Sequence, residues 1–133
     1  MRTLFADTFY YIALLSPADN AHARAVAFTR DFNGQMVTTA WILTELADGM
    51  ALPVNRSVFI SFLAGLRSDP QVSIVGPDPV LFDEGIALYA RRLDKEWSLT
   101  DCISFIVMQR EGLTEALTGD HHFEQAGFTA LLK

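Results

Sequence analysis

The sequence predicts an α/β fold in which helices cover both faces of a central parallel sheet. Two observations support this prediction: short strand-like segments alternate with helical segments, and no repeat, low-complexity tract or linker interrupts them. Alternation of this kind builds parallel sheets that lie buried between two layers of helices. Of the 133 residues, 50% are hydrophobic and 20% are charged, which is enough for one substantial core. We therefore expect a single domain over residues 1–133.

Five short apolar or β-prone segments, bounded by turn residues, are expected to be strands. They cover residues 2–6, 35–39, 72–75, 116–118 and 128–132. The segments between them carry apolar residues at spacings of three and four, which is typical of amphipathic helices. These cover residues 8–15, 20–32, 40–51, 55–68, 79–93, 99–111 and 121–125. The consecutive helices between residues 40 and 68 would be an insertion before the third strand.

Local chemistry predicts several helix boundaries. Asp78 followed by Pro79 combines an acidic cap with proline at the first helical position. Gly34 tolerates the left-handed conformation that ends a helix. The dipeptide Leu52-Pro53 is expected to stop one helix, and Asn55 is expected to cap the next.

The net charge of −6 argues against a simple nucleic-acid binder, which would show a basic surface. Four of these charges belong to the candidate site described below, which leaves about −2 for the rest of the protein (−6 minus −4). The only tight basic cluster is Arg91, Arg92 and Lys95. This cluster could steer RNA, and a solvated helix end explains it equally well.

Cysteine content and hydropathy limit the possible cellular location and metal chemistry of the protein. The single Cys102 excludes an internal disulfide or a cysteine-based metal cage, and its apolar helical surroundings predict a buried, inert thiol. No apolar segment approaches the ~20 residues that span a bilayer, and Asp7 interrupts the first apolar stretch, so we expect no signal peptide and a cytoplasmic location. The positive mean hydropathy of +0.22 suggests that some apolar surface is buried between subunits.

Four acidic residues occupy positions that an alternating strand–helix fold would bring together. Asp7 ends the first strand, Asp101 opens the most apolar helix, and Asp120 follows the fourth strand. Glu45 lies in the helix after the second strand. Parallel strands end at one edge of their sheet, and ligands bind in the crevice there, so we expect these carboxylates to converge. Carboxylates that converge need a cation, and Mg²⁺ or Mn²⁺ prefers oxygen ligands.

These residue types suit metal-dependent hydrolysis of phosphodiester bonds, because a divalent ion lowers the pKa of bound water and clamps phosphate oxygens. We expect Asp7 and Asp101 to hold the main ion. Asp120 would add a ligand, directly or through water. Glu45 would ligate a second ion or orient the attacking water. Nearby hydroxyl groups could hydrogen-bond the carboxylates or the phosphate; they belong to Thr8, Ser98 and Thr118.

Structural roles compete with this hypothesis. Asp7, Asp101 and Asp120 could each be a helix cap or a first-turn acid, a role worth ~1 kcal/mol. The coincidence of acids at three such ends weakens that interpretation, since Ser, Thr or Asn would cap as well. Glu45 is expected to be half-buried with no basic residue within one helical turn, so it needs another partner.

Other conspicuous residues are expected to be structural. His121 and His122 are interpreted as surface or helix-start residues, because neighbours on a helix face different directions. Trp97 is expected to pack in the core instead of stacking on a base. The apolar face from Val58 to Leu66 is expected to be core, with a subunit interface as the alternative.

Four stretches of the sequence occur in a characteristic order: FADTFYYIAL at residues 5–14, TEL at 44–46, SLTDCISF at 98–105 and LTGDHHF at 117–123. Their order and spacing resemble the PIN-domain family, and within it the VapC-like ribonuclease toxins of bacterial toxin–antitoxin systems. The resemblance implies a three-layer α/β/α fold with a parallel sheet of about five strands. It also implies an endoribonuclease dependent on Mg²⁺ or Mn²⁺. By motif match, its acidic residues are Asp7, Glu45, Asp101 and Asp120.

The resemblance further implies a homodimer and a cognate antitoxin that blocks the acidic pocket. The low isoelectric point departs from many toxin members, which carry a more basic surface. A non-toxin PIN nuclease of RNA processing and a non-catalytic PIN-like binding module are therefore the alternatives. A haloacid-dehalogenase-type phosphatase needs Asp-x-Asp after its first strand, which Asp7-Thr8-Phe9 lacks. A phosphate-accepting receiver needs an acidic pair near its first strand and a late lysine, and neither is evident.

Overall fold

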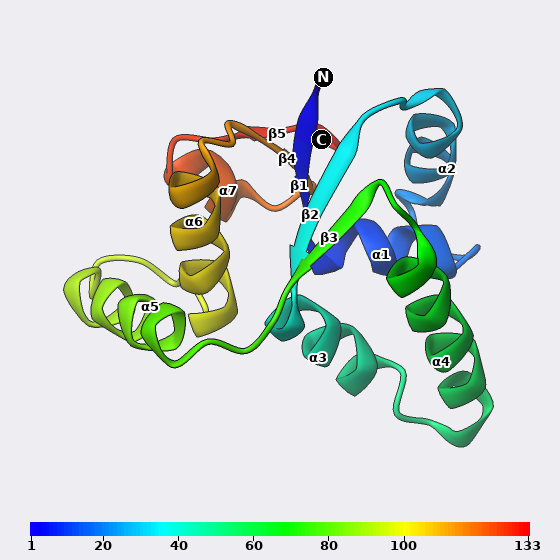
Figure 1. The fold of residues 1–133 in the computed structure, drawn as a ribbon, viewed down its shortest axis with the longest axis horizontal. Helices are drawn as coiled ribbons and strands as arrows, with labels where there is room; N and C mark the ends of the chain where they lie inside the picture. Colours follow the sequence, from blue (N-terminus) through cyan, green and yellow to red (C-terminus); the bar gives the residue numbers. More distant parts are fainter.

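The computed structural model describes residues 1–133 and contains five strands and seven helices (Figure 1). The strands are β1 (Thr3–Ala6), β2 (Gln35–Thr39), β3 (Val72–Val75), β4 (Glu115–Leu117) and β5 (Thr129–Ala130). The helices are α1 (Thr8–Leu15), α2 (His22–Asp31), α3 (Ala40–Gly49), α4 (Pro53–Ser68), α5 (Pro79–Arg91), α6 (Leu99–Glu111) and α7 (His121–Gln125). Every predicted strand and helix is present, and the differences lie at their ends.

The five strands form one parallel sheet in the order β3-β2-β1-β4-β5. The sheet is built outward from β1 in both directions: β2 and β3 lie on one side of it, and β4 and β5 lie on the other. The central strand β1 pairs Phe5 with Val37 of β2 and with Ala116 of β4. A crevice at the strand ends of such a switch point is where α/β sheets bind ligands. The predicted parallel sheet is confirmed.

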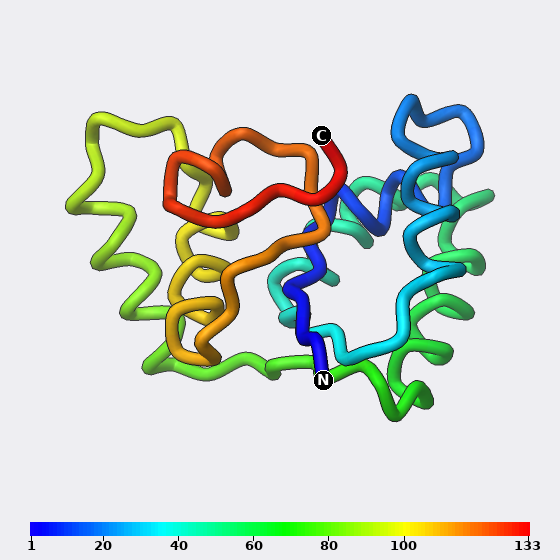
Figure 2. The backbone as a smooth tube through the Cα atoms, turned by 90° about the horizontal axis from the view of Figure 1, so that it is seen from above, coloured from blue at the N-terminus to red at the C-terminus, as the bar shows by residue number.

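Helices cover both faces of the sheet, which gives the predicted three layers. On one side lie α1, α2 and α4, and on the other lie α5, α6 and α7 (Figure 1). The view from above in Figure 2 shows the same separation, with the central strands between the two groups of helices. Helix α3 lies below the ends of the strands, where it contacts both α1 and α6.

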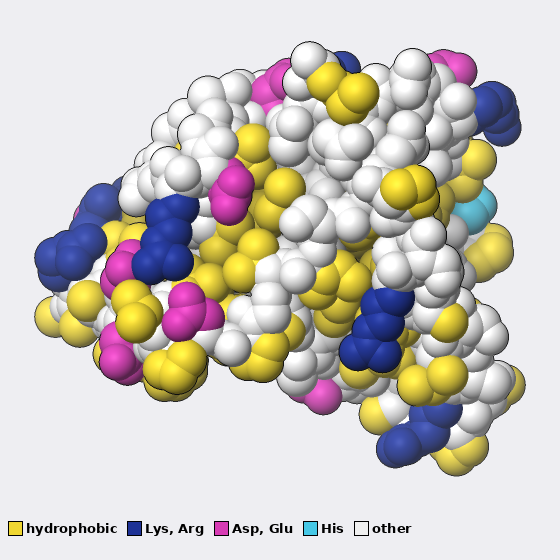
Figure 3. All heavy atoms as spheres, viewed as in Figure 1, with side chains coloured by type: hydrophobic (Ala, Val, Ile, Leu, Met, Phe, Trp, Pro, Cys, Tyr) yellow, Lys and Arg dark blue, Asp and Glu magenta, His cyan; other side chains and the backbone are white.

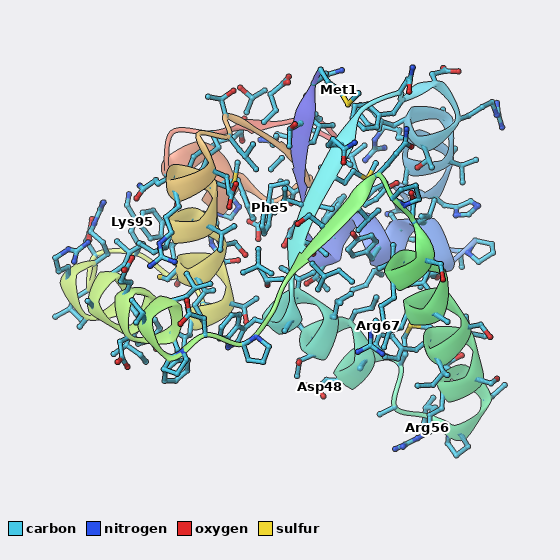
Figure 4. The ribbon with its side chains drawn as sticks, in the orientation of Figure 1. Met1, Phe5, Asp48, Arg56, Arg67 and Lys95 are labelled. Atoms are coloured by element: carbon cyan, nitrogen blue, oxygen red, sulfur yellow. The ribbon has the colours of Figure 1, made fainter.

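The core is centred on β1 and α6. Phe5 is fully buried and lies between the sheet and α6 (Figure 4). Phe105 of α6 packs edge-on against Phe123 and Trp97, with ring centroids 5.0 Å apart in both pairs. Trp97 is 6% exposed, and Cys102 is fully buried, so the predicted packing roles of both residues are confirmed. This core holds the N-termini of α6 and α7 beside the end of β1.

One predicted helix start is wrong. Helix α4 begins at Pro53 with Leu52 at the cap position, so Asn55 lies inside the first turn and does not cap it. Proline has a φ value suited to the first helical position and lacks only an N–H that would have no partner there. The Leu52-Pro53 pair therefore starts a helix, while the preceding helix α3 already ends at Gly49.

The apolar face of α4 is only partly core. Helix α4 contains no fully buried residue, although Phe59, Phe62, Leu63 and Leu66 pack against the core. Val58 stays 44% exposed. Figure 3 shows one face of the molecule, the face where the edge strand β3 lies. Hydrophobic side chains gather over the middle of this face. None of the helices is long and apolar enough to cross a lipid bilayer.

Candidate metal-binding active site

Asp7 sits at the turn from β1 into α1, beside the end of β4. It occupies the cap position of α1, yet its side chain makes no capping hydrogen bond to that helix. Its Oδ2 instead accepts a hydrogen bond from the hydroxyl of Thr118, at 2.7 Å. The role of Asp7 as a simple helix cap is therefore wrong, and its carboxylate is directed toward the strand ends.

Burial gives Asp7 unusual acid–base properties. Its side chain is only 5% exposed, and burial raises its pKa to about 7. The negative charges of Asp101 and Glu45 add to this shift, while hydrogen bonds from Thr118 and the Thr8 amide oppose it. A buried carboxylate without a charged partner is costly in its ionised form. The ionised form of Asp7 would therefore gain from a cation.

Asp101 combines a capping role with a place in the site. Its amide donates to the hydroxyl of Ser98 at 3.0 Å, while its Oδ2 accepts from the amide of Ser98 at 3.1 Å, which forms a capping box at the start of α6. The same Oδ2 lies 3.0 Å from Nδ1 of His122. Burial raises the pKa of Asp101, opposed by the bonds from Ser98 and His122. Asp101 therefore caps α6 and also lines the acidic cavity.

Asp120 also caps a helix, because its Oδ1 accepts from the amide of His122 at 2.9 Å at the start of α7. Its own amide donates to the Thr118 hydroxyl at 3.1 Å. Thr118 is completely buried, and its single hydroxyl thus accepts from Asp120 while it donates to Asp7. One threonine therefore connects two of the predicted acids.

The expected half-burial of Glu45 is wrong, because its side chain is exposed. Helix α3 buries Ile42, Leu43 and Leu46, and this places Glu45 at the rim of the core. The rim position still belongs to the same pocket as the three aspartates. The expected meeting of four acids is thus present, with Glu45 at the solvent side.

The acids converge on a cavity of about 340 Å³ that contains no lysine or arginine among its lining residues. The lining residues are Asp7, Thr8, Phe9, Ile12, Glu45, Glu96, Ser98, Asp101, Asp120 and His122. The hydroxyl of Thr8 is buried there and has no hydrogen-bond partner. Clustered carboxylates, an unpartnered hydroxyl and the absence of lysine and arginine together fit a hard divalent cation with its water or phosphate ligands.

Two polar members of this cavity, Glu96 and His122, are absent from the site that the sequence predicts. Glu96 is exposed at the rim, and only its position two residues before the capping Ser98 could have indicated it. His122 was interpreted as a surface or helix-start residue, but its side chain is only 18% exposed and contacts Asp101. Its neighbour His121 is 64% exposed, as expected.

The two histidines do not face away from each other. Their ring centroids are 4.5 Å apart, and both Nδ1 atoms approach Oδ1 of Asp120, at 3.6 Å from His121 and 3.5 Å from His122. Both residues lie in the first turn of α7, directly after the capping Asp120, so both rings can fold back onto it. The prediction that they diverge is therefore wrong.

The basic cluster lies beside this cavity and not within it. Arg92 forms an ion pair with Asp94 at 3.0 Å and covers the ring of Trp97, so much of its charge is locally compensated. Arg91 is exposed, and Lys95 lies near α5 (Figure 4). Arg92 and Lys95 line a second cavity, which shares Glu96 and Ser98 with the acidic one.

No family profile matches this sequence, and no curated protein matches it either. Solved structures that are similar in fold include VapC20 and FitAcB. VapC20 of Mycobacterium tuberculosis, a sarcin-ricin loop cleaving toxin, is 23% identical with a TM-score of 0.88, over 98% of this chain and 99% of VapC20. FitAcB of Neisseria gonorrhoeae is 21% identical with a TM-score of 0.66, over 98% of this chain and 96% of that one. The chain has the VapC-like PIN-domain fold.

Proposed function

We propose that residues 1–133 form one PIN-like nuclease domain that hydrolyses RNA phosphodiester bonds in a metal-dependent manner. The observation that carries this proposal is the acidic cavity, where buried Asp7 meets Asp101, Asp120 and Glu45 with no lysine or arginine among the lining. The ion would be Mg²⁺ or Mn²⁺, since both take carboxylate oxygens. The same four residues are the candidate metal ligands and catalytic residues.

A divalent ion bound there would lower the pKa of a coordinated water and offset charge on the phosphate. The chain's own groups orient the acids for that task. Thr118 holds Asp7, and the Ser98 amide holds Asp101. The unpartnered hydroxyl of Thr8 is available for a phosphate oxygen or a water molecule. The hydroxyl of Ser98 accepts the capping hydrogen bond at the start of α6, so its amide is the group that orients Asp101 in the site.

The proposed substrate is RNA, and the fold neighbour VapC20 is itself a sarcin-ricin loop cleaving toxin. Because the overall charge is −6, RNA contact must depend on local basic groups. Arg91 and Lys95 are the members of the basic cluster without a carboxylate partner, and Arg92 adds a guanidinium stacked on Trp97. The cavity lined by Arg92 and Lys95 adjoins the acidic one through Glu96 and Ser98, which suits an RNA strand that crosses both.

We further propose that the protein is the toxin of a cytoplasmic toxin–antitoxin pair. The fold supports this, because the fold neighbour VapC20 is a toxin. A cognate antitoxin would hold the nuclease inactive by blocking the acidic cavity.

A homodimer is proposed from the outer face of α5. Phe82, Ile86 and Tyr89 on α5, and Leu93 just after it, are 41%, 41%, 51% and 87% exposed. Phe82, Ile86 and Tyr89 are spaced by four and three residues, as in a heptad seam, which can pair with a second copy of itself about a two-fold axis, and Leu93 extends this apolar surface in the turn after the helix.

The experiment is cleavage of total RNA by purified protein with Mg²⁺, with Mn²⁺ or with EDTA. Asp7→Asn and Asp101→Asn test the site, and Asp48→Asn is the matched control, because Asp48 lies on α3 away from the acidic cavity (Figure 4). The proposal expects discrete fragments from wild type and Asp48→Asn only when a metal is present. Fragments that persist in EDTA or in the site variants would refute it. Mn²⁺ binding without cleavage would favour the non-catalytic module.

A further inference from the structure

We propose that His122 is a positioning residue that selects which carboxylate oxygens of Asp101 and Asp120 face the metal; this inference rests on the proposed metal-dependent function. His122 comes from α7, whereas Asp101 comes from α6, so the contact joins two helix N-termini.

His122 bonds both acids through two different groups. Its main-chain amide donates to Oδ1 of Asp120 at 2.9 Å. Its ring Nδ1 lies 3.0 Å from Oδ2 of Asp101. When Asp101 is ionised its carboxylate can only accept, so we assign the proton of this hydrogen bond to Nδ1 of His122. One residue thereby fixes the relative orientation of two carboxylates from separate elements.

These bonds occupy one oxygen of each acid and leave the other without a partner. Oδ2 of Asp101 receives both the Ser98 amide and the His122 ring, and its Oδ1 makes no hydrogen bond. Oδ1 of Asp120 receives the His122 amide, and its Oδ2 makes none. Outer hydrogen-bond partners of this kind orient metal ligands, and their loss typically costs 10–100-fold in metal affinity. Removal of the His122 ring would free Asp101 to rotate.

The adjacent histidine provides an internal control. His121 is exposed, and its nearest acid contact is 3.6 Å, beyond hydrogen-bond range, whereas the His122 ring is largely buried and directly bonded. Both rings lie near Asp120, so proximity to an acid does not distinguish the two histidines. The bond from Nδ1 of His122 to Asp101 does.

Isothermal titration of Mn²⁺ into His122→Ala, His122→Asn, His122→Gln and His121→Ala tests this role. The side-chain amide nitrogen of asparagine can take the place of Nδ1, and that of glutamine can take the place of Nε2. We expect His122→Ala and His122→Gln to bind Mn²⁺ about 10–100-fold more weakly than wild type. We expect His122→Asn and His121→Ala to bind close to wild type.

Wild-type affinity in His122→Ala would overturn the inference. Rescue by glutamine and not by asparagine would also overturn it, because the ring would then act through Nε2 as a direct ligand. Thermal unfolding in EDTA identifies any variant that fails to fold, and the asparagine–glutamine comparison then decides the question. If the wild type itself bound no Mn²⁺, the proposed function would fail first; binding by wild type with no effect at His122 overturns only the positioning role.

Discussion

The hydroxyl of Thr118 donates to Oδ2 of Asp7 over 2.7 Å, although 111 positions separate the two residues in the sequence. The contact exists because β1 and β4 are parallel neighbours in which Ala6 pairs with Leu117. The next residue of each strand therefore emerges at the same edge of the sheet. Sheet pairing thus supplies the hydrogen bond that holds the most buried acid of the site.

Thr118→Val should lower the free energy of unfolding by about 1–3 kcal/mol, because valine keeps the shape but leaves two buried polar groups without their partner. It should also raise the pKa of Asp7 further, since the Thr118 bond lowers that pKa in the wild type. Urea unfolding in EDTA measures the first effect. Thr118→Ser keeps the hydroxyl and is the control. Wild-type stability in Thr118→Val, or a loss confined to Thr118→Ser, would show that the methyl group matters and the hydrogen bond does not.

The pKa of Asp7 predicts a pH-dependent stability difference in metal-free protein. Burial raises this pKa from 3.8 to about 7, so the folded protein binds the proton more tightly than the unfolded chain does. The resulting stabilisation is complete below the unfolded pKa and is lost as the pH rises through about 7. Asp7→Asn has no such loss. Its stability relative to wild type should therefore increase with pH, by up to a few kcal/mol.

Urea unfolding of both proteins in EDTA across this pH range measures that difference. Asp48→Asn serves as the control, because Asp48 is exposed and outside the site. A constant difference between Asp7→Asn and wild type would contradict the prediction. Mn²⁺ affinity of the wild type should also fall as the pH drops below about 7, since a ligand must lose its proton to bind.

Replacement of two helical glycines by alanine should change the free energy of unfolding in opposite directions. Gly85 of α5 is buried, and a Cβ there would overlap Cγ1 of Ile103 on α6. Gly85→Ala should therefore cost about 1–3 kcal/mol through overpacking. A Cβ at Gly65 of α4 meets nothing within 4 Å. Gly65→Ala should stabilise the protein by about 0.5–1 kcal/mol, because alanine is the better helix former.

Thermal unfolding of the two glycine variants beside wild type provides the comparison. A stable Gly85→Ala variant would mean that α5 and α6 can separate without cost. That result would contradict the close packing seen between them.

Ile86→Lys should convert the proposed homodimer into a monomer, because it places a charge in the middle of the exposed apolar row on α5. Val54→Lys is the matched control, since Val54 is 77% exposed on α4 and lies outside that row. Light scattering during gel filtration measures the mass of each. A dimeric Ile86→Lys, or a monomeric wild type, would exclude this interface. Mn²⁺ binding should be unchanged in both variants, because neither residue lines the acidic cavity.

Much of the fold and part of the site could be predicted from local sequence. The alternation of strands and helices predicts the parallel sheet, and that sheet predicts that acids at its strand ends meet. This accounts for Asp7, Asp101 and Asp120, whose positions relative to their own strand or helix are local properties. Asp78-Pro79 likewise predicts the start of α5, because capping depends on neighbouring residues alone.

The depth and orientation of the site residues were decided only by tertiary structure. Glu45 lies at the rim because packing of Ile42 and Leu46 sets the rotation of α3, which a single segment does not reveal. His122 reaches Asp101 because the aromatic core around Phe105 and Phe123 holds α6 against α7. The sequence by itself therefore determined which chemical groups reach one sheet edge. Packing between distant elements determined which are buried, which are bonded and which oxygens stay free, because those properties depend on contacts across the chain.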